Sequence, residues 1–72
     1  MNSDFKIKLG KLLNHWIEHN REHSQEFSEW AQKARENGET KVSQEMLQAA
    51  REMEKASASL SQALLSLETK ER

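Results

Sequence analysis

The sequence predicts an all-α protein, an antiparallel hairpin of two long helices. The chain has no proline and only two glycines, and no segment shows the alternating apolar and polar residues of a strand. One helix break is evident, at the Asn-Gly-Glu-Thr segment of residues 37–40. We therefore expect a single domain, 1–72, with helices over about residues 4–36 and 41–67, a turn at 37–40 and a frayed tail at 68–72.

The first predicted helix ends at a recognisable stop signal. Gly38 suits the left-handed position that follows many helix C-termini, because glycine has no Cβ to clash there. Lys33 and Arg35 lie near the negative end of the helix dipole, which favours positive charge. Thr40 can then cap the second helix. A turn this short makes the two helices antiparallel neighbours.

Both helices carry residues at heptad spacing that mark a core-facing stripe. In the second helix the columns are Met46, Met53, Leu60 and Leu67, then Ala49, Ala56 and Ala63, then Ala50, Ser57 and Leu64. In the first helix they are Leu9, Trp16, His23 and Trp30, then Leu13, Asn20, Phe27 and Ala34, then Phe5, Leu12 and His19. The expected core and interface residues are Leu9, Leu12, Leu13, Trp16, His23, Phe27, Trp30, Met46, Ala49, Met53, Ala56, Leu60 and Leu64.

The size of the chain predicts self-association. A domain of this length buries only about 60% of its unfolded surface, so a single core rarely suffices without support. Cysteine is absent, which excludes disulfides and thiolate zinc sites. Two long helices that contact each other along a single narrow seam leave part of their apolar surface exposed to solvent. We therefore expect a homodimer in which two hairpins form a four-helix bundle.

Charge and hydropathy limit the other partners. The net charge of −1 disfavours nucleic acid, whose binding depends on neutralising phosphates. No apolar run approaches the ~20 residues of a membrane span, and no signal peptide is recognisable. Together with the lack of cysteine, these observations predict a cytoplasmic protein.

All three histidines lie in one segment, where the pattern His-x-x-Glu occurs three times in succession from His15 to Glu26. Residues four apart lie on the same face of a helix. We measured the rotation about the helix axis from Trp16, at the centre of the stripe. His23 is rotated by about 20°, His19 by about 60° and His15 by about 100°. We therefore expect His15 outside, His19 at the rim and His23 in the core.

A histidine in the core at position 23 has a structural interpretation. Its nitrogens need hydrogen-bond partners when buried, and Asn20 lies on the same face, three residues earlier. A polar pair of this kind can fix the register of an apolar seam. If His23 were fully dry, its protonation in acid would also destabilise the fold.

The alternative interpretation of the histidines is a metal site. Two histidines four apart can bind one Zn²⁺ or Ni²⁺ through imidazole nitrogens. Because His15 and His23 are about 12 Å apart along the helix, one ion cannot take all three. The candidate pairs are His15/His19 and His19/His23, with Glu22 or Glu26 as the oxygen ligand. A dimer brings together two such pairs and supplies four ligands.

The segment of residues 15–23 (HWIEHNREH), with Phe27, Trp30-Ala31 and residues 33–35 (Lys-Ala-Arg), resembles a family of short uncharacterised prokaryotic helical-hairpin proteins. The resemblance covers the first helix and the turn, and it implies the hairpin fold without an established activity. In similar proteins a histidine-rich leader sometimes precedes this helix and implies metal handling; here only residues 1–4 come before it.

The function predicted from these observations is a non-catalytic structural or interaction module that self-associates through its Trp/Leu/Met/Ala seam. No nucleophile–base pair and no phosphate-binding glycine loop is recognisable, and a two-helix hairpin offers little concave volume for a substrate. No cofactor is expected. The alternative is a small zinc- or nickel-binding protein that uses the His-x-x-Glu repeat.

Overall fold

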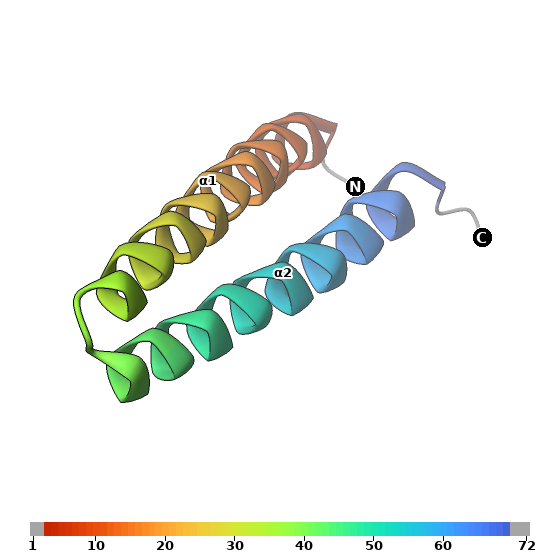
Figure 1. The fold of residues 1–72 in the computed structure, drawn as a ribbon. Coiled ribbons are helices and arrows are strands. Elements are labelled where there is room, and N and C mark those ends of the chain that lie inside the picture. Colours follow the sequence, from red (N-terminus) through yellow and green to blue (C-terminus); the bar gives the residue numbers. More distant parts are fainter. Residues whose placement is uncertain (1–2, 70–72) are drawn as a thin grey trace.

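The computed structural model describes residues 3–69, and over this range it consists of two antiparallel helices side by side (Figure 1). Helix α1 spans Ser3–Glu36 and helix α2 spans Thr40–Thr69. The predicted hairpin is confirmed, and each observed helix end lies within two residues of its predicted position. Residues 68 and 69, expected in a frayed tail, instead belong to α2, whereas residues 70–72 lie outside the described range.

The turn between the helices is closed by backbone hydrogen bonds around Gly38. Its amide donates to the Arg35 carbonyl oxygen at 3.0 Å, and the Glu39 amide donates to the Ala34 carbonyl oxygen at 2.8 Å. This is the Schellman pattern, which requires a left-handed residue, and Gly38 has a φ of 85°. The predicted role of this glycine is therefore confirmed.

The start of α2 differs by one residue from the prediction. Thr40 is the first helical residue and not the cap. Glu39 precedes the helix, and its carbonyl oxygen accepts the first helical hydrogen bond, from the Ser43 amide at 2.9 Å. The Schellman turn places Glu39 at this position because it leads directly from Gly38 into the next helix.

The helices pack along a seam made of two heptad columns from each, and every member is buried or half-buried. On α1 the seam consists of Gly10, Ile17, Ser24 and Ala31, together with Leu13, Asn20, Phe27 and Ala34. On α2 it consists of Ser43, Ala50, Ser57 and Leu64, together with Met46, Met53, Leu60 and Leu67. This is the heptad seam of an antiparallel pair.

One column of the seam differs from the sequence prediction. Trp16 and Trp30, expected at the centre of the stripe on α1, are 41% and 55% exposed, and Leu12 is 39% exposed. The column one residue further along, which includes Ile17 and Ala31, takes the seam position instead. Ser24 and Ala31 in this column are small, so the helices approach closely there, and an indole ring at these positions would hold them apart.

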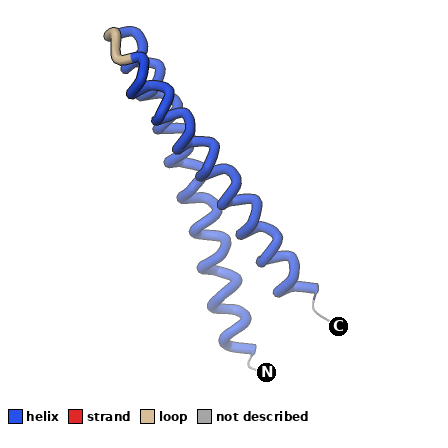
Figure 2. Tube along the Cα trace, turned by 90° about the horizontal axis from the view of Figure 1, so that it is seen from below, coloured by secondary structure: helices blue, strands red, loops and turns tan. Residues whose placement is uncertain are grey.

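The remaining predicted core residues divide between the seam and its edge. Leu13 is buried, and Phe27 and the predicted methionines and leucines of α2 are half-buried within the seam. Leu9, His23 and Ala49 are half-buried at the edge of the seam, and Ala56 is exposed. The helices lie close together near the turn and spread apart toward their free ends (Figure 2).

The close approach at Ala31 predicts intolerance of a larger side chain. Ala31 has no exposed surface, so Ala31→Leu must push the helices apart and is expected to lower the free energy of unfolding by about 1–3 kcal/mol. Ala58→Leu is the matched control, because Ala58 is exposed on α2. Urea unfolding followed by circular dichroism measures both variants. Equal midpoints for the two would contradict the seam described here.

The two glycines predict opposite effects of one substitution. Gly38→Ala is expected to destabilise by about 1–2 kcal/mol, because its φ of 85° is strained for any residue with a Cβ. Gly10→Ala is expected to stabilise by about 0.5–1 kcal/mol, because Gly10 is inside α1 and an added Cβ meets only Leu67 Cδ2, at 3.9 Å. Melting temperatures that shift in the same direction would show that one of these assignments is wrong.

Candidate functional site

The two edges of the seam differ in chemistry, and one of them, the polar flank, is mostly hydrophilic. Each residue of this flank immediately follows a seam residue. The members are Asn14, Arg21, Ser28 and Arg35 on α1 and Leu47, Glu54, Ser61 and Glu68 on α2. The Ser24 hydroxyl donates toward this edge, with the Ala50 carbonyl oxygen and Glu54 Oε2 each 3.2 Å away. A shallow depression beside it is lined by Arg21, Ser24, Gln25 and Glu54.

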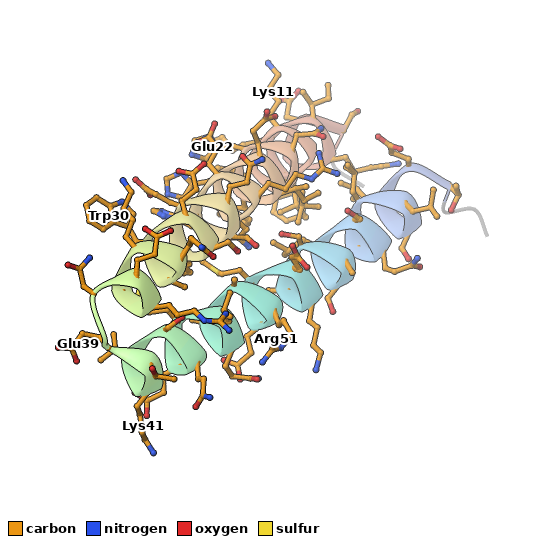
Figure 3. The ribbon with its side chains drawn as sticks, in the orientation of Figure 1. Lys11, Glu22, Trp30, Glu39, Lys41 and Arg51 are labelled. Carbon is orange, nitrogen blue, oxygen red and sulfur yellow. The ribbon has the colours of Figure 1, made fainter. Side chains whose placement is uncertain are left out.

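The opposite edge, the apolar flank, carries large hydrophobic side chains that the hairpin leaves partly exposed. Each residue next to the seam here immediately precedes a seam residue, so it is rotated about 100° to this side. The members are Leu9, Trp16, His23 and Trp30 on α1, with Phe5, Leu12 and His19 beyond them, and Val42, Ala49, Ala56 and Ala63 on α2. Trp30 projects from α1 away from α2 (Figure 3).

The apolar flank is divided by side-chain size. The α1 half is bulky and protrudes, with Phe5 59% and Trp30 55% exposed. The α2 half is a row of alanines that begins at Val42, which is 44% exposed. Val42 was not among the predicted core or interface residues, although its position seven residues before Ala49 extends the alanine column. Large side chains on α1 and small side chains on α2 thus lie along the same face of the hairpin.

The three histidines form a continuous row along the bulky half of this flank. The rings of His15 and His19 stack with centroids 5.6 Å apart, and His19 meets His23 edge-on at 4.4 Å. His23 in turn stacks on Phe27 at 5.8 Å. The row therefore runs from the outer surface of α1 inward to the seam, in the order that the helical rotation predicts.

His19 and His23 are the pair whose nitrogens the structure brings together. Their Nε2 atoms are 3.0 Å apart, a hydrogen bond when one of the two carries a proton. The other nitrogen of His23, Nδ1, lies 3.6 Å from Glu26 Oε1. His15 contacts His19 through its ring face and so does not present a nitrogen to the same point. Glu22, the other predicted oxygen ligand, is exposed.

Two expectations about these histidines need correction. His23 lies at the edge of the seam with 38% of its side chain exposed, so it is not the dry core residue that acid sensitivity would require. Asn20 lies within the seam, but His23 hydrogen-bonds to His19 and lies within ion-pair distance of Glu26. Within residues 3–69, no group of three or more histidine, aspartate or glutamate side chains is placed to hold a metal ion.

Residues 9–67 match the family described as "Domain of unknown function (DUF8180)". The chain belongs to this family. The DUF8180 domain thus covers the turn, nearly all of both helices and all of the apolar flank except Phe5. The resemblance to an uncharacterised helical-hairpin family is confirmed, and membership brings no established activity. No curated protein and no solved structure matches the chain.

The helices were also compared with the requirements of a membrane span. Neither α1 nor α2, which together with the turn make up the described part of the chain, is long and apolar enough to cross a bilayer.

Proposed function

We propose that this DUF8180 protein is a non-catalytic helical module that self-associates, two copies packing their apolar flanks together into a four-helix bundle. The observation that supports the proposal is the apolar flank itself. Trp16, Trp30, Leu12 and Phe5 all expose a large part of their surface on one side of the seam. Contiguous apolar surface of this kind marks interaction sites in soluble proteins.

The thin core of the hairpin supports the same proposal. The buried hydrophobic residues in the described range are Leu13, Ile17, Ala31 and Ala50, and two of these are alanines. Burial contributes about 25 cal/mol per Å² of apolar surface, so alanines contribute little. Small domains that lack disulfides gain stability from metals or oligomerisation. A second copy on the apolar flank would bury the tryptophans that the hairpin leaves exposed.

The position of the flank suits a bundle of four helices. The residues next to the seam on the apolar flank, such as Trp16 and Ala56, lie about 80° around their helices from the middle of the seam. In a square bundle each helix has two neighbours in directions about 90° apart. The hairpin therefore supplies one neighbour for each helix, and the apolar flank faces the place where the second neighbour belongs.

The self-association predicts a specific effect of charge on the flank. Trp16→Glu is expected to weaken the dimer by about 2 kcal/mol, roughly 30-fold in Kd, because it replaces a large apolar contact with a charge. Leu65→Glu is the matched control, because Leu65 is 52% exposed but lies off the flank. Analytical ultracentrifugation over a concentration series measures both. A monomeric wild-type protein at all concentrations, or equal effects of the two variants, would refute the proposal.

The second candidate function is binding of Zn²⁺ or Ni²⁺, and the observation that favours it is the His19/His23 pair. The two Nε2 atoms lie 3.0 Å apart, within hydrogen-bond distance of each other. Two nitrogen ligands of a tetrahedral zinc, each about 2.0–2.1 Å from the ion, are separated by about 3.3 Å. A small opening of the two rings would therefore admit an ion between them.

Metal binding predicts a gain of stability that depends on His19. At a free ion concentration 100-fold above Kd, binding to the folded state should add about 2.7 kcal/mol to the free energy of unfolding. His19→Ala is expected to abolish this gain, whereas Lys55→Ala, on the exposed surface of α2, should leave it intact. Thermal melts of tag-free protein with and without Zn²⁺ or Ni²⁺ test this. An unchanged melting temperature in wild type would exclude the metal function.

The cytoplasmic location and prokaryotic origin stay predictions of the sequence. They affect neither candidate function, because the apolar flank and the histidine pair are properties of the hairpin itself.

A further inference from the structure

We propose that the free-end cavity, a groove between the ends of α1 and α2 far from the turn, binds a medium-chain fatty acid. The cavity measures about 330 Å³. It is lined by Lys6, Ile7, Gly10, Lys11 and Asn14 on α1 and by Leu67 and Glu68 on α2. Ligand pockets in proteins begin at about 300 Å³ and combine apolar walls with a few polar groups that orient the ligand.

The cavity exists because the seam has no side chain at Gly10. The helices spread apart toward their free ends (Figure 2), so a side chain at this position would extend into the space between them. A Cβ added at Gly10 would meet only Leu67 Cδ2 within 4 Å, at 3.9 Å. Glycine is unfavourable inside a helix, and residues that break such a local rule are expected at functional sites. The empty seam position is the first observation that favours a ligand.

Ile7 and Leu67 give the cavity apolar walls from both helices. Ile7 is 58% exposed and lies about 180° around α1 from Trp16, so a second copy on the apolar flank would leave it uncovered. Ile7 precedes Asn14 by seven residues and therefore shares its column on the polar flank. An alkyl chain in the groove would cover Ile7 and Leu67 together, and burial of apolar surface is favourable. The self-association proposed above does not account for this surface.

The charges around the cavity favour an anionic head group. Two lysines, Lys6 and Lys11, line it together with one acidic residue, Glu68. Asp4 and Lys8 are the other charged residues between positions 3 and 13, and both lie outside the lining. A carboxylate at the cavity can pair with either lysine, whereas an ammonium group would be repelled by both. The alkyl chain and the carboxylate together describe a fatty acid.

The extent of the lining limits the length of the ligand. On α1 it runs from Lys6 to Asn14, about 12 Å at 1.5 Å per residue, which is the length of an alkyl chain of about ten carbons. Decanoate is therefore the probe that fits the groove.

The two isoleucines of the chain provide an internal test of the site. Ile7 lines the cavity, whereas Ile17 is buried in the seam. In a methyl correlation spectrum of isoleucine-labelled protein, decanoate should shift the Ile7 signal saturably and leave the Ile17 signal in place. Ile7→Val removes one signal and so assigns both. An unchanged Ile7 signal at millimolar decanoate, or equal shifts of the two signals, would overturn the proposal.

Substitutions in the lining test the position and the charge of the ligand. Gly10→Leu should abolish binding, because its side chain occupies the cavity, and circular dichroism checks that the helices remain. Lys6→Gln and Lys11→Gln should each weaken binding by about 1.5–5-fold, and Glu68→Gln should strengthen it. Lys8→Gln, outside the lining, is the matched control and should leave the affinity unchanged. Equal affinities of the Lys8 and Lys11 variants would contradict the placement of the carboxylate.

Matched compounds test the head group and the other possible occupants. Decylammonium has the same chain with the opposite charge and should bind more weakly than decanoate; equal binding would overturn the proposal. Binding to phosphatidylglycerol vesicles without binding of decanoate would assign a membrane surface to this end instead. An Ile7 signal that moves with protein concentration alone would assign a second copy. Either result overturns the fatty-acid site.

The site is independent of the self-association proposed above, and one variant shows this. Trp16→Glu changes the opposite side of α1 and should keep the decanoate-dependent shift of Ile7 while it weakens the dimer. A protein that is monomeric but binds decanoate refutes the self-association and retains the site. A dimer in which decanoate leaves Ile7 unchanged does the reverse.

Discussion

The close approach of α1 and α2 through small side chains is the constraint on which the rest of the structure depends. Ser24 and Ala31 on one helix and Ser43, Ala50 and Ser57 on the other are small and buried, so an indole ring would hold the helices apart at these positions. The seam accommodates Leu13, Ile17 and Phe27, whereas Trp16 and Trp30 lie beside it, on the apolar flank. Both candidate functions are located on this flank.

The helices and the turn could be predicted from the sequence because they depend on local interactions. Gly38 is the clearest case, since one left-handed residue determines a set of backbone hydrogen bonds within five residues of it. The columns of Met46 and Ala50 on α2 were also recognisable, because their periodicity coincides with the seam. In these regions the local pattern and the tertiary contact agree.

The seam of α1 was harder to predict, because its apolar stripe serves two surfaces. Averaged over the helix, the hydrophobic pattern centres on Trp16, whereas the contact with α2 centres between Ile17 and Leu13. The seam includes Gly10 and Ser24, whose side chains add nothing to a hydrophobic pattern. A periodicity argument weights bulk, but several seam positions on α1 hold small residues. For the histidines, spacing alone identified two candidate pairs, and the orientation of the rings singles out His19 and His23.

The placement of the two tryptophans allows spectroscopy to distinguish association of the hairpin from its folding. The chain has no tyrosine, and both indoles lie on the apolar flank outside the seam. Lys33 Nζ lies 4.3 Å from the centre of the Trp30 ring, so a cation lies beside one of them. Their fluorescence reports whether the apolar flank is exposed to solvent or buried. The helical circular dichroism signal in the far ultraviolet reports whether the hairpin is folded. One unlabelled sample thus contains separate optical reporters for the two equilibria.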